Sequence, residues 1–248
     1  MKSFCCTLLF LTIAFGSMAQ APRQDGGLWA GVQISKDLPR NFSIGGQYQI
    51  RLNRNFGNIN WHYFYVNVGY RFNKYLAAGL VYRYGTSTRI DRHAFAVTLT
   101  ARYKAKDWMV AYRTAYQRKQ PYFNRSYEPG LEPQNLWRHR FLVQYSINKR
   151  WDIYAFTELF FRFTNQRNYL QRLRNSIGVD WEFYKYNTIT VAYIFQPEMF
   201  EPRPRWSHIL GITYQFDIPR KMKWKKYFSG GKSNKSKDKQ ERERDTFL

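Results

Sequence analysis

The stretch YFYVNVGYRFNKYLAAGLVYRY, residues 63–84, decides the fold. Apolar side chains occupy every second position, as at Phe64 and Val66, and the alternation resumes after a break at residues 73–74. Successive side chains of a strand point to opposite faces, so this period predicts two antiparallel strands joined by a tight turn. One face of this hairpin is apolar, while the other carries Arg71 and Arg83.

The same alternation continues with little interruption over residues 28–216, in eleven segments. Each segment has about 9–13 residues, the length that a tilted strand needs to cross the hydrocarbon layer of a bilayer. The apolar face is rich in Tyr and Trp, whereas the core of a soluble sandwich would favour aliphatic residues. We therefore expect an all-β fold, a transmembrane antiparallel up-and-down β-barrel. A soluble periplasmic β-protein is the alternative.

The connections between segments alternate in length, as expected for an outer-membrane barrel with short periplasmic turns and long external loops. The short connections are residues 73–74, 104–107, 148–150 and 185–187, and the longer ones are 85–92, 118–135, 164–171 and 196–205. Aromatic residues gather at the segment ends, where such barrels carry aromatic girdles. Those expected at the outer rim are Trp61, Tyr84, Tyr116, Trp137 and Trp206.

The number of strands is less clear than the pattern. Bacterial single-chain barrels have an even number of strands, but the sequence offers eleven segments. If residues 41–52 form the first strand, then ten strands follow and residues 28–36 are left over. That segment is expected either to pair with the last strand in a twelve-strand barrel or to lie inside the lumen. We expect about 10–12 strands.

The N-terminus resembles an export signal. Lys2 precedes an apolar run at residues 4–15, and Ser17 and Ala19 are the small residues that signal peptidase requires. The run is too short for a membrane-spanning helix, which needs about 20 residues. We expect cleavage after Ala19 and a location in the outer membrane of a Gram-negative cell. Both cysteines, Cys5 and Cys6, would be removed, which excludes disulfides and a cysteine nucleophile.

These features divide the chain into a signal peptide (1–19), a short segment (20–27), a barrel (28–216) and a basic tail (217–248). The formal net charge is +23, of which +16 belongs to residues 20–216. The tail holds 11 basic and 5 acidic residues and has the composition of a disordered periplasmic extension. Its charge suits contact with anionic lipid or peptidoglycan. Export and the spacing of arginines along strands argue against nucleic acid as a partner.

Two further segments carry a resemblance to known proteins. Gly211-Ile212-Thr213-Tyr214-Gln215-Phe216 resembles the closing-strand signal read by the outer-membrane assembly machinery, which would be a partner during insertion. Leu28-Trp29-Ala30-Gly31, followed by Lys36-Asp37-Leu38 and Gln47-Tyr48-Gln49-Ile50-Arg51, resembles a family of uncharacterised Bacteroidota outer-membrane barrels, a domain of unknown function. The resemblance covers residues 26–216. It implies a barrel and brings no established activity or catalytic residues.

The inner face is expected to be strongly basic. Ten arginines fall on it by parity: Arg51, Arg71, Arg83, Arg102, Arg113, Arg138, Arg140, Arg162, Arg172 and Arg174. The inward acidic residues are Asp152, Glu158, Asp180 and Glu182. These charges either pair with each other and with tyrosine hydroxyls in a polar core, as in a structural membrane protein, or form a narrow porin-like passage that prefers anionic solutes.

The histidines offer a weaker hypothesis. By parity His62, His139 and His208 share the outward face near the rim, where contact with outer-membrane lipid is more plausible than metal ligation. Some small barrels are lipid-modifying enzymes, and Ser207-His208 with His93 is the arrangement that could support one here. No spacing specifies it. We therefore expect no catalytic residues, no metal site and no cofactor.

Overall fold

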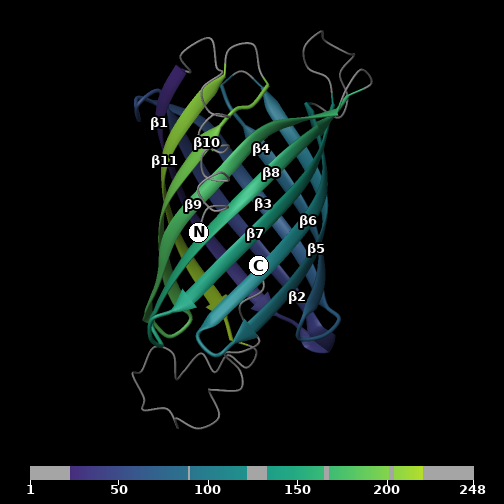
Figure 1. Ribbon diagram of the computed structural model, residues 1–248, viewed down its shortest axis with the longest axis vertical. Coiled ribbons are helices and arrows are strands. Elements are labelled where there is room, and N and C mark those ends of the chain that lie inside the picture. Colours follow the sequence, from purple (N-terminus) through teal and green to yellow (C-terminus); the bar gives the residue numbers. More distant parts are fainter. Residues whose placement is uncertain (1–22, 89, 122–132, 165–167, 201–203, 220–248) are drawn as a thin grey trace, which may run out of the picture.

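The computed structural model describes residues 23–88, 90–121, 133–164, 168–200 and 204–219, and in these residues eleven strands form one closed barrel (Figure 1). The strands are β1 (Arg23–Asp37), β2 (Phe42–Asn53), β3 (Asn58–Arg71), β4 (Leu76–Thr86), β5 (Asp91–Ala105), β6 (Trp108–Pro121), β7 (Gln134–Ser146), β8 (Trp151–Phe163), β9 (Asn168–Tyr184), β10 (Asn187–Pro197) and β11 (Arg205–Ile218). A short 3-10 helix, η1 (Pro39–Asn41), joins β1 to β2. None of the described segments is a helix long and apolar enough to traverse a bilayer.

Ten strand pairs join neighbours in the chain and are antiparallel, whereas β1 and β11 close the barrel as a parallel pair. Their register runs without interruption from Arg23↔Arg205 to Lys36↔Ile218. The expected barrel of ten to twelve strands is confirmed, but the even count is wrong. In an up-and-down barrel with an odd number of strands, the first and last strands must run in the same direction.

Residues 28–36, which had no clear place in the sequence analysis, lie in the barrel wall within β1. They pair with β11, but neither in a twelve-strand barrel nor inside the lumen. β1 starts at Arg23 rather than Leu28, and β11 ends at Ile218 rather than Phe216. The expected signal peptide and most of the expected basic tail lie outside the described residues, so both stay predictions.

The apolar side chains point out of the barrel. Leu80, Val97 and Ile177 have exposed fractions of 61%, 57% and 63% in the isolated chain. A soluble protein rarely leaves so large an apolar surface uncovered, and the sheet closes on itself rather than packing against a second sheet. The hypothesis of a soluble sandwich is therefore wrong. Lipid is the solvent of this face.

The connections alternate in length less than expected. Those of β2–β3, β4–β5 and β8–β9 have four residues each, as do those of β1–β2, β3–β4 and β7–β8 at the other end. Only the β6–β7 and β10–β11 connections are longer, and both lie at the same end, called here the long-connection end (Figure 1).

Two short turns share one device. Between β3 and β4, the Asn73 side chain accepts hydrogen bonds from the backbone N–H groups of Tyr75 and Leu76 at 2.8 and 2.9 Å. Between β7 and β8, the Asn148 side chain accepts the equivalent hydrogen bonds from Arg150 and Trp151. Such asparagine turns fix the strand register locally. At the other end, β4, β6 and β9 extend several residues into the segments expected to be loops.

Two glycines provide a test of lumen packing. A Cβ on Gly85 would lie 2.4 Å from the ring of Tyr63, which is 7% exposed and packs beneath Arg51 and Arg83. The ring has no room to retreat, so we expect Gly85→Ala to destabilise the barrel by about 1–3 kcal/mol. The measurement is the urea midpoint of the folded protein in detergent, followed by heat-modifiable gel mobility.

Gly46→Ala is the matched control. Its Cβ would meet its nearest atom, the Tyr65 carbonyl oxygen, at an ordinary 3.8 Å. We expect a midpoint near that of the unmodified protein. Equal midpoints for the two variants would show that the Tyr63 packing is wrong.

Candidate functional site: the arginine-lined lumen

All ten arginines expected on the inner face lie on strands that point them into the barrel. Eight of them line one internal cavity, together with Arg92, Lys119 and Arg205. The other two lie towards the strand ends. Arg102 donates to the Lys74 carbonyl oxygen at 3.4 Å near the short turns, and Arg162 donates to the Tyr169 hydroxyl at 3.3 Å near the long connections. Eight of the ten predicted side chains therefore line the cavity.

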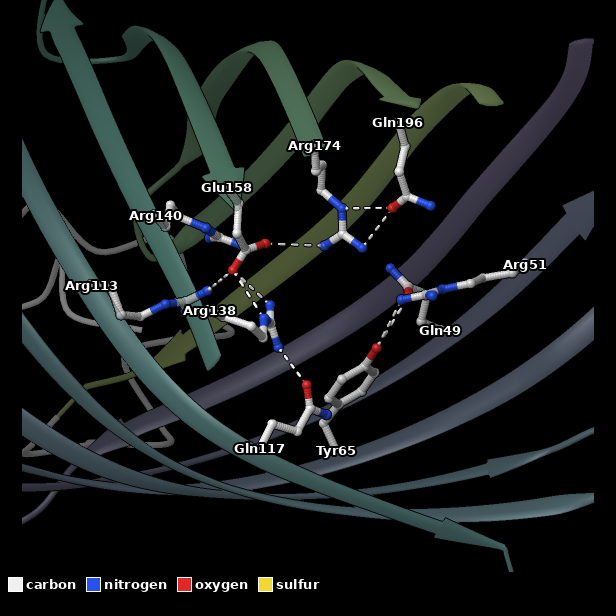
Figure 2. A network of polar contacts seen from close by, with 10 residues as sticks. All are labelled: Gln49, Arg51, Tyr65, Arg113, Gln117, Arg138, Arg140, Glu158, Arg174 and Gln196. Carbon is white, nitrogen blue, oxygen red and sulfur yellow. Dashed lines mark hydrogen bonds and ion pairs between the residues drawn. The ribbon is translucent and has the colours of Figure 1, made fainter. Parts of the chain in front are cut away.

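Glu158 on β8 is the centre of the densest group of charges. Its side chain is 1% exposed, and four arginines surround its carboxylate (Figure 2). Arg113 and Arg138 lie 3.2 and 2.7 Å from one oxygen; Arg140 and Arg174 lie 3.2 and 3.3 Å from the other. A carboxylate has about four acceptor positions, so the four guanidinium groups saturate it. We call these five residues the Glu158 cluster; its formal charge is +3.

Glutamines and aromatic rings extend this cluster across the lumen. Gln117 accepts from Arg138 at 3.1 Å, and Gln196 accepts two hydrogen bonds from Arg174 at 3.0 and 2.9 Å (Figure 2). Arg174 also lies over the ring of Trp29 on β1, at 5.0 Å from its centroid.

Arg51 lies over the same Trp29 ring at 3.8 Å and donates to the Tyr65 hydroxyl at 3.0 Å. Trp29 thus connects the Glu158 cluster to the opposite wall. The side chains in Figure 2 come from β2, β3, β6, β7, β8, β9 and β10 and converge inside the barrel.

A second group of cations lies nearer the long connections. Arg83 on β4 and Lys119 on β6 are both opposite Ala94 of β5, a small buried residue, so the two cations flank it. Arg172 and Arg138 lie close enough to Lys119 to interact with it electrostatically. Among the described residues, Lys119 forms no hydrogen bond or ion pair. We call Arg83, Lys119 and Arg172 the upper basic group.

The cavity between these groups has a volume of about 760 Å³. Its lining includes eleven basic side chains and two acidic ones, Asp25 and Glu198. One wall, formed by β4, β5 and β6, presents small side chains such as Gly79, Ala96 and Ala115. These small side chains leave the open space beside the basic residues. The volume is in the range of small-molecule sites.

The remaining inward acidic residues lie towards the short turns. Asp180 accepts from the Thr190 hydroxyl at 2.6 Å and is opposite Asp152 on β8. Glu182 accepts from the backbone N–H of Tyr186 at 3.3 Å. Neither these contacts nor the cavity lining brings them to the cationic groups, so Glu158 alone of the four acidic residues neutralises the central arginines.

Residues 26–208 match the family described as protein of unknown function, DUF2490. The chain belongs to this family. The predicted membership of a family of unknown function is thereby confirmed, and the DUF2490 chain is a barrel of the outer-membrane type. No curated protein matches it.

Several solved outer-membrane barrels are similar in shape to this DUF2490 barrel. The NanC porin is 16% identical, with a TM-score of 0.48, over 69% of this chain and 85% of that one. A bacterial polysaccharide outer-membrane secretin is 9% identical, with a TM-score of 0.49, over 69% and 63%. The β domain of the Bordetella autotransporter BrkA is 13% identical, with a TM-score of 0.44, over 67% and 79%. At such identities no function is transferred.

The enzyme hypothesis meets a geometric obstacle. Ser207 lines the cavity, whereas its neighbour His208 points outward and hydrogen-bonds Tyr193 on the outer face. His93 is also on the outer face, bonded to Tyr82. The proposed Ser–His arrangement therefore does not form. Within the described ranges, no group of three or more His, Cys, Asp or Glu side chains is placed to hold a metal ion.

Sequence reasoning missed several lumen residues. Trp61 was expected at the outer lipid rim, but it is paired with Arg51 in the sheet register and lines the cavity, where Arg92 lies over its ring at 4.9 Å. Parity with Phe64 would have shown this, because odd positions of β3 face inward. Trp29, Lys119 and Phe160 were also missed, although each lies on the inner face by the same rule.

Glu158 provides a direct test of the cluster. Glu158→Gln keeps the shape but removes the negative charge that four guanidinium groups contact. Breaking a buried ion-pair network typically costs about 3–5 kcal/mol, so we expect a loss of that size in the free energy of unfolding. The measurement is equilibrium urea unfolding in detergent. Asp107→Asn is the control, since its ion pair with Lys106 is exposed and should contribute about 0–1 kcal/mol. An unchanged midpoint for Glu158→Gln would contradict the cluster.

Proposed function

We propose that this barrel is a narrow outer-membrane pore that prefers small anionic solutes. The observation that carries the proposal is the cavity, in which eleven basic side chains face two acidic ones. Rings of Arg and Lys favour anions in pores. The solutes of this proposal carry carboxylate or phosphate groups, which match the planar donor fork of arginine.

The two cationic groups suggest successive steps along the lumen. The upper basic group lies towards the long connections, and its Lys119 forms no ion pair among the described residues, so the group would attract an anion at the outer mouth. The Glu158 cluster lies deeper and is held by ion pairs and glutamines. In this proposal it forms the constriction, where a net positive charge passes anions and repels cations.

The arginines are held in place by more than ion pairs. Arg138, Arg172 and Arg174 lie 4.8, 5.2 and 4.9 Å from the centroid of the Phe160 ring. Cation–π contacts of this kind contribute about 0.5–2 kcal/mol each. They offset part of the repulsion between like charges without neutralising them. The lumen can therefore stay basic, whereas a polar core of a purely structural protein would be expected to pair its charges.

The test is conductance of the purified full-length chain in a planar bilayer under a salt gradient. We expect a current whose reversal potential has the sign for chloride preference. Absence of current, or a preference for potassium, would contradict the proposal.

A charge-reversal pair refines this test. Lys119→Glu places an acid in the upper basic group, and we expect the anion-to-cation permeability ratio to fall by roughly twofold or more. Lys149→Glu makes the same charge change in the exposed turn between β7 and β8, away from the cavity. It should leave the ratio unchanged. Equal permeability ratios for the two variants would show that the upper basic group does not determine the ion selectivity.

A further inference from the structure

All four histidines of the chain form the same contact on the outer face of the barrel. Each accepts or shares a hydrogen bond through Nδ1 with a tyrosine hydroxyl of the adjacent strand. The pairs are Tyr48–His62 at 2.8 Å, Tyr82–His93 at 2.8 Å, Tyr112–His139 at 2.7 Å and Tyr193–His208 at 2.6 Å. They join β2 to β3, β4 to β5, β6 to β7 and β10 to β11, the two strands of four hairpins that end at the long-connection side.

The four pairs also share one register. In each, the tyrosine lies directly opposite the residue two positions after the histidine, which is Phe64, Phe95, Phe141 or Leu210. Both partners therefore occupy the lipid-facing side. A repeat of this kind on four separate hairpins is a feature of the whole barrel and not of one loop.

The histidines lie at a common height relative to the apolar surface. On each return strand the histidine is the first clearly polar residue above a run of outward apolar or aromatic side chains, as in Phe64, Val66, Val68, Tyr70 and Phe72 above the short turn of β3. Ten strand residues rise about 33 Å along the strand. At a tilt near 45° this covers about 23 Å of height, close to the apolar band of about 25 Å in such barrels. The pairs thus lie near the upper boundary of the hydrocarbon layer, just below outward aromatic residues such as Tyr116 and Trp137.

The fifth hairpin of this side has a polar pair lower on the wall. On β9, Asn175 contacts the hydroxyl of Thr157 on β8 at 2.9 Å. The register partner of His139 is Leu159, two residues further along β8, so the Thr157–Asn175 pair lies below the level of His139. We call the four Tyr–His pairs, without this fifth pair, the Tyr–His ring.

The hydrogen-bond pattern leaves a donor pointing outward. His208 Nε2 lies 2.9 Å from Oε1 of Gln24, which can only accept. Its proton is therefore on Nε2, and the tyrosine hydroxyl donates to Nδ1. For His62 and His139, Nε2 has no hydrogen-bond partner among the described residues. With the same tautomer, each presents an Nε2–H to whatever surrounds the barrel at this height.

We propose that the Tyr–His ring binds phosphate groups of lipids in the leaflet at the long-connection end, with the Nε2–H groups of His62 and His139 donating to phosphate oxygens. The ring faces away from the lumen, so no solute of the pore reaches it. The pairs are distributed over hairpins around the barrel, and no single partner protein could contact them all. A surrounding layer of lipid does contact them all, and its charged acceptors lie at this boundary. This inference depends on the barrel being in lipid and not on its conducting ions.

The test uses the full-length chain labelled with ¹⁵N-histidine and folded in phosphatidylglycerol bilayers, with dephasing of the imidazole signals by ³¹P in solid-state NMR. A hydrogen bond of 2.7–2.9 Å to a phosphate oxygen places nitrogen and phosphorus about 4 Å apart. We expect the Nε2 signals of His62 and His139 to be protonated and to dephase at that distance. Unprotonated Nε2, or signals without dephasing, would overturn the proposal.

A tyrosine variant tests whether the hydroxyl groups position the Nε2–H donors, or whether the histidines are merely close to lipid phosphate. Tyr48→Phe with Tyr112→Phe removes the hydroxyls that direct the proton to Nε2 at both histidines, and we expect their dephasing to be lost. Tyr103→Phe, an outward tyrosine near the short turns, should retain it. Unchanged dephasing in the double variant would overturn the role of the pairs. Dephasing by inorganic phosphate in phosphate-free detergent would show a site for the free anion and overturn the assignment to lipid.

Discussion

The structure depends on closing the backbone hydrogen-bond ladder. In a hydrocarbon layer no water is available to the peptide groups, and each unpaired one costs several kcal/mol. The chain satisfies this constraint with ten antiparallel pairs and one parallel pair, β1 with β11, over fourteen consecutive register partners. Parallel pairing is slightly less stable per residue, but an open edge in lipid would be far more costly. The odd count has a geometric consequence: Arg23 and Ile218 lie at opposite ends of the barrel (Figure 1).

Closure of the barrel separates the lipid outside from the lumen inside. Because side chains alternate along each strand, every strand then presents one set of residues to the lipid and another to the lumen. Lipid receives the aliphatic and aromatic residues, whereas the lumen receives the arginines. Crowding so many guanidinium groups would be unfavourable without compensation. Glu158 neutralises part of the central charge, and the rings of Trp29 and Phe160 contact several of the rest. Small residues on β4 to β6 leave an open space beside them, and the result is a basic cavity rather than a filled core.

The residue period made the faces of the barrel predictable, and with them eight of the arginines that line the cavity, but Arg92 and Arg205 were missed. The closure was not predictable, because the register of β1 with β11 joins residues about 180 positions apart and has no local signal. β1 also contains Gly26, Gly27 and Gly31, which weaken its apolar pattern, and so its first residues were taken as a separate segment.

The sequence could not predict which side chains contact one another within each face. The four arginines of the Glu158 cluster come from three other strands and meet only because those strands are adjacent. The Tyr–His pairs have sequence separations of 14, 11, 27 and 15 residues, since each depends on the length of the loop between the strands. No fixed spacing could have revealed them. Parity alone placed three of the histidines on the outer face.

The most direct test of the account is a cross-link across the closure. Ala30 and Ile212 are register partners on the lipid-facing side of β1 and β11. In a full-length chain with Cys5 and Cys6 replaced by serine, Ala30→Cys with Ile212→Cys should be joined by a short thiol cross-linker, which yields a monomer that resists heat-induced unfolding on gels. Ala30→Cys with Ile153→Cys on β8 should not be joined. Failure of the first pair, or equal joining of both pairs, would contradict an eleven-strand barrel closed by a parallel pair.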